Sequence, residues 1–317
     1  MGMLDGNIVI VTWAGTGVGR EAALSCARAG AAVVVGDLKG AAETAALVAA
    51  EGGAAFAVEG DLADFQAAGR LVAAAVDGFG GLNGVVNSGK AGPERRTVNM
   101  TPDEFDDVLR VNLRSAFCTT RHAARWWREH ARPGAIVNTT SVSGLLGKLG
   151  EANDGAAKAA VAAYTVVTAL ELARYRVRVN ALAPASCRVA GAAGAGAQPD
   201  ARGGDRLHDR LHDRLHPAAG RGDPGGAGSG VVWLLSDAAA GISGQVFGIT
   251  GGVLELYRGW APVRSVAAEG HWTPEGLAAA ARDLVAGAPA PPAASWPPGR
   301  PLPRDPAEWP SGLAGAT

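Results

Sequence analysis

The chain has 317 residues, which allows one large α/β domain or two small ones. Its 29 Lys and Arg residues nearly balance its 30 Asp and Glu residues, and the formal net charge of −1 disfavours a nucleic-acid-binding protein that relies on bulk positive charge. We expect neither a membrane span nor a signal peptide, because the sequence shows no long uninterrupted apolar stretch and no apolar leader. The cysteines Cys26, Cys118 and Cys187 are widely spaced, which fits a cytoplasmic protein and disfavours a disulfide scaffold or a cysteine-rich zinc site.

Strand and helix patterns alternate along residues 7–260. Short apolar runs rich in β-branched residues predict strands, and Ala-rich or amphipathic stretches between them predict helices. The predicted strands are 7–12, 32–36, 54–58, 82–87, 135–140, 176–182 and 245–250, and the predicted helices are 17–30, 41–51, 64–77, 101–130, 151–174 and 230–236. This order predicts a doubly wound, Rossmann-like parallel sheet with helices on both faces, in one domain that spans residues 1–260.

Two segments do not follow this pattern. Residues 185–229 show no credible strand, are dominated by Gly, Ala, Arg and Asp, and enclose an Arg-Leu-His-Asp repeat over 206–216. We expect an irregular, low-complexity lid region, and an out-of-frame stretch of a GC-rich gene is an alternative origin for it. The repeated histidines fit low complexity better than a zinc site, so no metal is predicted. The last 59 residues hold 11 of the 18 prolines, so residues 261–317 are predicted to be a Pro/Ala-rich, partly disordered extension.

A glycine-rich turn follows the first predicted strand, with the sequence Thr12-Trp13-Ala14-Gly15-Thr16-Gly17-Val18-Gly19. Glycines between a strand and a helix let the backbone approach a pyrophosphate at the helix N-terminus. Asp37 ends the second predicted strand, where an acidic residue binds the adenosine ribose hydroxyls. An ordinary tight turn is the alternative, but Asp37 and the strand–helix context favour a dinucleotide site.

These motifs and later ones resemble those of the short-chain dehydrogenase/reductase family over residues 5–184 and about 230–260. Asp61-Leu62 resembles the adenine-contacting Asp motif of the family, and Asn87-Ser88-Gly89-Lys90 stands where the family has its NNAG turn. The resemblance implies NAD(P)-dependent oxidation or reduction of a hydroxyl or ketone, and similarity to the (3R)-hydroxyacyl-CoA dehydrogenase branch points to a hydroxyacyl thioester. The cofactor-binding residues that it implies are Thr12, Gly15, Gly17, Val18, Gly19, Asp37, Asp61, Leu62, Asn87, Lys158 and Pro184.

The resemblance also implies a catalytic set that lacks one member. Asn112 matches the Asn that organises a proton-relay water, Ser141 matches the catalytic Ser, and Lys158 matches the catalytic Lys. The catalytic Tyr, expected four residues before the Lys, is replaced by Asp154. Asp154 is either a catalytic carboxylate or an ion-pair partner of Lys158 on the same helix face. We expect Lys158 to lower the pKa of Asp154 and leave a bare carboxylate at neutral pH.

A second departure concerns the cofactor. Trp13 replaces the first glycine of the fingerprint, and we expect its indole to fill the pyrophosphate space and weaken dinucleotide binding. The carboxylate of Asp37 disfavours a 2′-phosphate and Thr16 supplies no positive charge for one, so NAD is expected rather than NADP.

Three hypotheses about function remain open. The chain is an oxidoreductase scaffold with impaired or repurposed redox chemistry, a non-redox dehydratase or cyclase that uses Asp154 as acid or base, or a non-catalytic subunit of a heteromer with an active homologue. We expect a small-molecule substrate and no nucleic-acid or membrane partner. The resemblance implies that subunits pair through the helices at 102–130 and 151–174, so we expect a homodimer, a tetramer or a heteromer with an active homologue.

Overall fold

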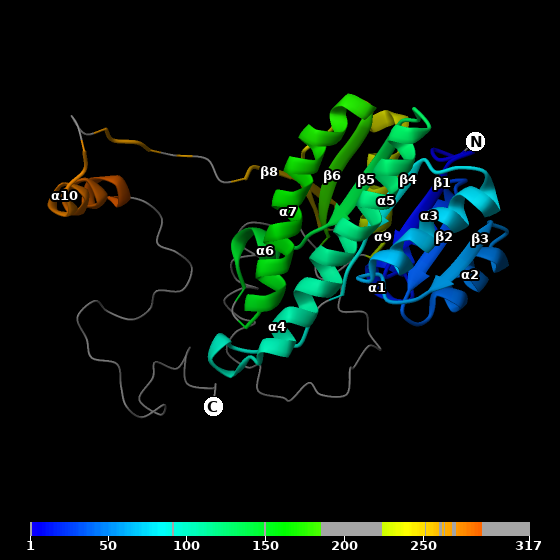
Figure 1. The fold of residues 1–317 in the computed structure, drawn as a ribbon, viewed down its shortest axis with the longest axis horizontal. Coiled ribbons are helices and arrows are strands. Elements are labelled where there is room, and N and C mark those ends of the chain that lie inside the picture. Colours follow the sequence, from blue (N-terminus) through cyan, green and yellow to red (C-terminus); the bar gives the residue numbers. More distant parts are fainter. Residues whose placement is uncertain are drawn as a thin grey trace. The chain divides into compact units, whose positions relative to one another are not determined.

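The computed structural model describes residues 2–184, apart from 91 and 149, and residues 224–286, apart from 251, 260, 261, 263 and 268–270. Within them the chain forms an eight-stranded sheet in the order β3-β2-β1-β4-β5-β6-β7-β8 (Figure 1). The strands are β1 Ile8–Thr12, β2 Ala32–Asp37, β3 Ala55–Glu59, β4 Gly84–Asn87, β5 Gly134–Thr139, β6 Val177–Pro184, β7 Val246–Thr250 and β8 Val253–Tyr257. All neighbours pair in parallel except β7 and β8. The predicted doubly wound, Rossmann-like fold in one domain is thereby confirmed.

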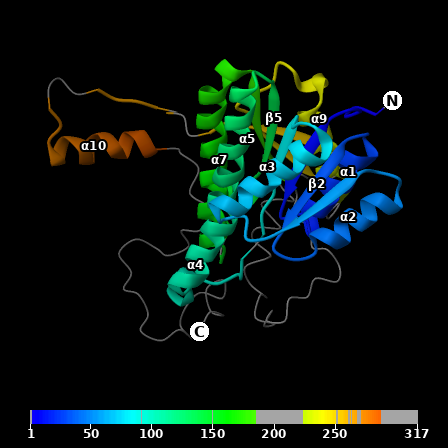
Figure 2. The ribbon, with the colours of Figure 1, turned by 45° about the vertical axis from the view of Figure 1, so that its right-hand side comes forward.

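Helices cover both faces of the sheet, as Figures 1 and 2 show. One buried cluster joins the sheet to α1 and α9, and a second joins it to α3, α5 and α7. The helices are α1 Gly17–Arg28, α2 Ala41–Ala50, α3 Phe65–Phe79, α4 Pro102–Leu109, α5 Ser115–Glu129, α6 Val142–Leu146, α7 Ala152–Leu172, α9 Pro224–Leu235 and α10 Pro274–Val285. Small side chains such as Ala22, Ala23 and Ala123 are fully buried and let these helices approach the sheet closely.

Several boundaries differ from the sequence prediction. The helix predicted from Gly230 begins six residues earlier, at Pro224, so part of the predicted lid region is helical. Strand β8 was not predicted, and it runs antiparallel to β7. Helix α10 lies in the predicted extension, and its cap Thr273 and first-turn Pro274 are the usual start signals of a helix. Residues 185–223 and 287–317, with Cys187 and the histidine repeat, lie outside the described residues.

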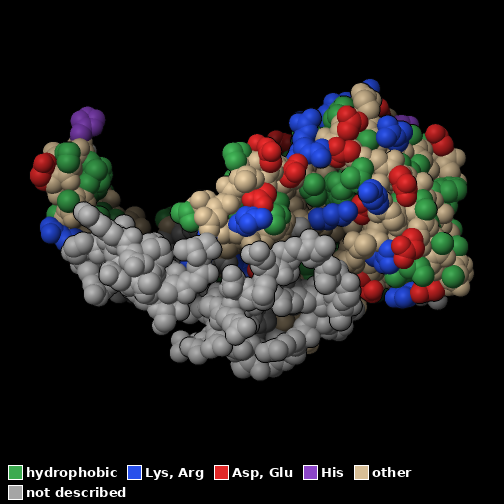
Figure 3. Space-filling view, turned by 90° about the horizontal axis from the view of Figure 1, so that it is seen from below, with side chains coloured by type: hydrophobic (Ala, Val, Ile, Leu, Met, Phe, Trp, Pro, Cys, Tyr) green, Lys and Arg blue, Asp and Glu red, His purple; other side chains and the backbone are tan. Residues whose placement is uncertain are grey.

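Helix α7 with its short extension, Ala152–Tyr175, has the length and composition of a membrane-crossing helix, with a mean hydropathy of 1.4 over its most apolar stretch. It packs against β6, α4 and α6, which is the place of a core helix in this fold. The chain divides into two units, Met1–Tyr257 and Arg258–Thr317, and the first contains the whole sheet. On the face drawn in Figure 3, basic and acidic side chains are interspersed, in keeping with the near-zero net charge.

Candidate active site

The predicted site residues lie at the carboxyl ends of the parallel strands. The strand order reverses between β1 and β4, and ligands of such sheets bind in the crevice at that reversal. Thr12 ends β1 and its hydroxyl accepts a hydrogen bond from the backbone N–H of Ser88, 3.1 Å away, just after β4. Asn87 ends β4, and its amide donates to Asn138 on β5 at 2.8 Å and to Thr120 at 3.0 Å. These hydrogen bonds connect the carboxyl ends of β1, β4 and β5.

Asn112 is positioned by an interruption of helical geometry. The helix predicted from residue 101 to about 130 is split by one π-helical turn, η2 Arg110–Arg114, between α4 and α5. Such turns often mark functional sites. The Asn112 amide donates to the carbonyls of Val108 and Lys90, both at 2.9 Å, so it joins the helix to the turn after β4. Its Oδ1 is buried and has no hydrogen-bond partner among the described residues.

Ser141 follows β5 and caps helix α6. Its hydroxyl oxygen accepts from the backbone N–H of Gly144 at 3.2 Å, and the hydroxyl donates to Oδ2 of Asp154 at 3.3 Å. Ser141 and Asp154 are therefore brought together as the resemblance implied for the family's Ser and Tyr positions. The hydroxyl is committed to the carboxylate, which leaves Oδ1 of Asp154 as the unpartnered oxygen of the pair within the described part of the chain.

Asp154 and Lys158 are both buried, with exposed fractions of 8% and 7%. The ammonium of Lys158 donates to the carbonyl of Thr139 at 3.2 Å, and the ion pairs of the described residues do not include one between Lys158 and Asp154. Burial lowers the pKa of Lys158, against the opposing charge of Asp154. The alternative of a direct helix ion pair is therefore wrong.

The pKa of Asp154 moves in the direction opposite to the sequence prediction. Burial raises the pKa of this carboxyl, and the positive charge of Lys158 opposes the shift without overcoming it. The predicted net lowering is wrong because the sequence showed the charged neighbour but not the loss of solvent. Asp154 holds its proton to a higher pH than an exposed Asp does.

Gly89 explains how closely these groups pack. A Cβ atom at this position would lie 2.0 Å from Oδ1 of Asn112 and 3.0 Å from Nζ of Lys158. The absence of a side chain therefore brings the turn after β4 against both catalytic-position residues. The resemblance has Ala here, and the Cβ of an Ala would not fit without a shift of Asn112.

The adenosine half of the predicted dinucleotide site is differently arranged. Asp37 is completely buried, and its Oδ2 accepts from the backbone N–H of Gly15 at 2.9 Å. Its Oδ1 lies 2.9 Å from the ammonium of Lys90, a residue for which the sequence suggested no role. A lysine in place of the last glycine of the NNAG turn was the signal that could have identified it. The carboxylate that was predicted to bind the ribose thus already has a cationic partner.

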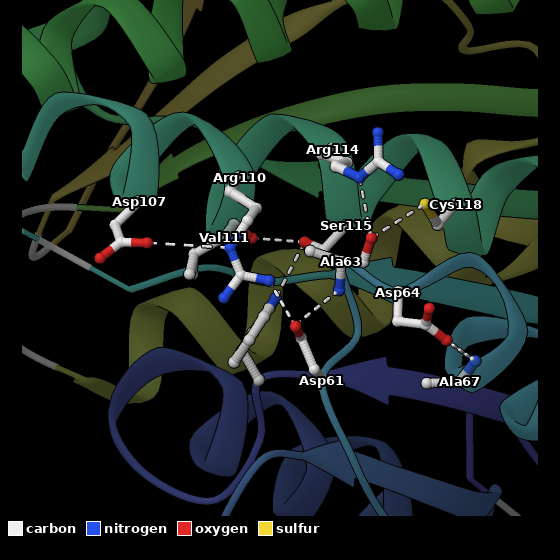
Figure 4. A network of polar contacts seen from close by, with 11 residues as sticks. Asp61, Ala63, Asp64, Ala67, Asp107, Arg110, Val111, Arg114, Ser115 and Cys118 are labelled. Carbon is white, nitrogen blue, oxygen red and sulfur yellow. Dashed lines mark hydrogen bonds and ion pairs between the residues drawn. The ribbon is translucent and has the colours of Figure 1, made fainter. Parts of the chain in front are cut away.

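The remaining predicted cofactor residues keep their places around the turn. Gly17 has φ +59°, a conformation that favours glycine, and a Cβ at Gly19 would lie 2.3 Å from the Trp13 carbonyl oxygen. Val18 lies in the first turn of α1 and Pro184 ends β6. Leu62 is buried, whereas Asp61 pairs with Arg110 of η2, as Figure 4 shows. Within the described residues, no group of His, Cys, Asp and Glu side chains has the arrangement of a metal site.

The indole of Trp13 does not lie where the sequence predicted it. It is 3% exposed and donates its N–H to the hydroxyl of Ser115 on α5, 2.9 Å away. It belongs to the buried cluster on the α3 and α5 face of the sheet, whereas α1 packs on the opposite face. The indole therefore does not lie at the start of α1, where the sequence predicted it to fill the pyrophosphate space; it packs in the same buried cluster as Leu62, on the other face of the sheet.

Comparison with known proteins places these residues in a family. A family profile described as enoyl-(acyl carrier protein) reductase matches residues 14–254. Hydroxyacyl-CoA dehydrogenase ChsB1 of Mycobacterium tuberculosis is 38% identical over 299 residues, with 90% of each chain covered. A 3-oxoacyl-[acyl-carrier-protein] reductase of Synechocystis is 31% identical over 258 residues, covering 80% of this chain and 99% of that protein.

A solved structure agrees with the sequence matches. The crystal structure of a short chain dehydrogenase from Mycobacterium avium has 35% sequence identity and a TM-score of 0.78, and it covers 92% of this chain and 98% of that one. Enzymes of this family use NAD(P), and the matched residues include every catalytic position considered above. The chain belongs to the short-chain dehydrogenase/reductase family.

Proposed function

We propose that this chain is a short-chain dehydrogenase/reductase in which NAD(P)-linked redox turnover is strongly impaired. The observation that carries the proposal is Asp154 at the position of the catalytic Tyr, buried beside Lys158 and hydrogen-bonded to Ser141. The family reaction needs a group that gives a proton to a ketone oxygen or takes one from an alcohol. Positioned acid–base groups of this kind contribute about 10²–10⁴ in rate.

Reach is the main obstacle. The Asp154 carboxyl is joined to the backbone by a single methylene group, whereas the phenol oxygen of a Tyr lies at the far end of an aromatic ring. The carboxyl oxygens therefore end several ångström short of the position of the family's proton donor. The raised pKa of Asp154 makes a proton easier to hold but does not move it closer to the substrate. Ketone reduction and alcohol oxidation are both expected to be slow.

The substrate class follows from the relatives. The curated relatives named above act, by their names, on hydroxyacyl-CoA and on 3-oxoacyl groups carried by acyl carrier protein. A hydroxyacyl or oxoacyl thioester is therefore the substrate class that we propose. NAD remains the dinucleotide to test first because Asp37 disfavours a 2′-phosphate, although the ammonium of Lys90 beside it reduces that preference.

A second candidate is a non-redox reaction with Asp154 as acid and base. Oδ1 of Asp154 is buried without a partner in the described part of the chain, and burial raises the pKa of the carboxyl. Such a carboxyl can take the α-proton of a hydroxyacyl thioester and return it to the departing hydroxyl, which forms a C=C bond and water. This dehydration needs no change of oxidation state and no dinucleotide.

The decisive experiment measures redox and dehydration on the same hydroxyacyl thioester. We expect wild-type NAD-linked oxidation to be at least about 10²-fold below that of an intact family member. Asp154→Tyr combined with Trp13→Gly and Lys90→Gly should recover oxidation, since the triple change restores the proton donor and the glycines of both cofactor turns. Strong wild-type turnover that persists in Asp154→Ala would contradict the proposal.

The same assay separates the other hypotheses. Cofactor-free dehydration that is lost in Asp154→Ala would establish the non-redox candidate. Absence of both reactions in the wild type and in the rescue variant would instead favour a non-catalytic subunit, to be tested by co-purification with an active homologue.

A further inference from the structure

Trp13 has an unusual backbone conformation, and its side chain is fixed by packing and by a hydrogen bond. Its backbone has φ +50°, in the left-handed region that a tryptophan rarely occupies. Its buried indole shares a cluster with Leu62, one of the two residues that the family resemblance assigns to adenine. The hydrogen bond to Ser115 fixes the ring against α5, and the Ser115 hydroxyl in turn donates to the carbonyl of Val111. A planar aromatic side chain is therefore packed in the same buried cluster as a residue that the resemblance assigns to adenine.

Lys90 acts on the same half of the site. Its ammonium lies 2.9 Å from Oδ1 of Asp37 and 5.0 Å from the centre of the Trp13 ring. A cation over an indole face is attracted to it, so the lysine and the tryptophan stabilise each other's placement. Backbone N–H groups of Gly15 and Lys39 complete the hydrogen bonds to Asp37. Ribose hydroxyls, which would donate to this carboxylate, would meet one that already accepts three hydrogen bonds, one of them from an ammonium group.

Asp61 is engaged as well. Arg110 of η2 pairs with its carboxylate, and the backbone N–H of Ala63 donates to it at 3.1 Å (Figure 4). Every side chain that the family resemblance assigns to adenosine therefore already has a partner from the chain itself. The residues present do not fit the adenosine half of a dinucleotide.

We infer that this chain occupies its own adenosine half-site, with the Trp13 indole in the place of the base and the Lys90 ammonium in the place of the ribose hydroxyls. An adenosine-containing ligand must move a buried indole and separate a cation from a buried carboxylate before it can bind. This inference concerns binding alone and does not depend on Asp154 or on the proposed function.

The test uses calorimetric titration of the full chain with ADP and with NADH. Wild type should show no binding of either at micromolar concentrations. We take each obstacle to reduce the affinity by about a factor of ten. Lys90→Ala should therefore bind both ligands at least about tenfold more tightly than wild type. The double variant Trp13→Gly with Lys90→Gly should gain about another tenfold in affinity. Lys39→Ala is the matched control: it removes an exposed lysine next to Asp37 whose side chain makes none of these contacts, and it should bind like wild type.

Circular dichroism and thermal melts establish that each variant is folded. If the variants with Trp13→Gly do not fold, the affinity of Lys90→Ala alone tests the inference. Lys90 is partly exposed, so its removal leaves the core intact. Micromolar binding of ADP or NADH by wild type would overturn the inference, and so would a folded Lys90→Ala that binds no better than wild type. The proposed function would survive both results, since it rests on turnover at Asp154 and not on affinity.

Discussion

At the scale of single residues, the pair Asp154 and Lys158 shows how burial decides chemistry. Two opposite charges one helical turn apart stabilise each other on an exposed helix face. Here both side chains are buried, and burial favours the neutral form of each group. It therefore raises the pKa of Asp154 and lowers the pKa of Lys158. Ser141 and Thr139 take the hydrogen bonds that an ion pair would have used. The carboxyl is thereby prepared to hold or accept a proton.

The raised pKa predicts a pH dependence of stability. A carboxyl that binds its proton more tightly in the folded protein than in the unfolded chain costs stability as the pH rises through the interval between the two pKa values. Asn cannot ionise, so the melting temperature of Asp154→Asn relative to wild type should increase across the pH range that begins at the unfolded-state pKa of about 4. Thermal unfolding followed by circular dichroism across this range measures the difference.

The matched control is Asp77→Asn, which removes an exposed carboxyl on α3 and should show no such trend. If Asp154→Asn instead lost melting temperature relative to wild type as the pH rose, the attraction of Lys158 would outweigh burial. The carboxyl would then be ionised in the folded protein, as the sequence suggested.

At the scale of elements, the π-helical turn η2 carries Asn112 and determines where its side chain lies in the candidate site. A continuous α-helix over 102–129 would carry Asn112 past the turn after β4, whereas the extra residue in η2 directs its amide to the carbonyl of Lys90. The second amide bond, to Val108, closes the helical turn beneath it. Asn112 thus positions the turn that carries Lys90.

Asn112→Leu should lower the free energy of unfolding by about 2 kcal/mol, since two buried hydrogen bonds are lost at about 1 kcal/mol each. Urea unfolding monitored by fluorescence measures the change. Asn99→Leu, at an exposed position of the 3-10 turn Thr97–Asn99, is the control and should leave stability nearly unchanged. Equal stability of both variants and wild type would show that Asn112 does not hold this turn.

At the scale of the whole molecule, exposed apolar side chains on α7 suggest how subunits meet. Val167 and Leu170 are 52% and 76% exposed on this helix, and Phe117 is 47% exposed on α5. Contiguous exposed apolar surface on a folded protein commonly marks an interface. The oligomer expected from the sequence, formed through these helices, stays a prediction, as does a location in the cytoplasm.

Val167→Glu with Leu170→Glu should convert a dimer or tetramer into a monomer, because two carboxylates would be buried without partners at the interface. Light scattering at high micromolar concentration measures the mass, and a thermal melt shows that the fold is retained. Leu47→Glu is the control, since Leu47 is 40% exposed on α2, which packs with the opposite face of the sheet. A wild-type monomer, or an unchanged mass in the double variant, would contradict the prediction.

The fold and the residues at the candidate catalytic positions could both be predicted from the sequence. Apolar strands that alternate with helices predict a parallel sheet covered by helices, and the spacings of Ser141, Asp154 and Lys158 along the chain can be read without coordinates. Strand β8 escaped prediction because an edge strand with one exposed face has a weak apolar signal, as the half-exposed Leu254 and Leu256 show.

The state of the candidate site could not be predicted, because it depends on tertiary packing. The pKa of Asp154 depends on how much solvent its neighbours exclude, and those neighbours come from β5, α6 and α7. The partnership of Lys90 with Asp37 joins residues 53 positions apart, and that of Trp13 with Ser115 joins residues 102 apart. A sequence shows which side chains are present, but contacts at such separations, and the desolvation that accompanies them, are set by packing alone.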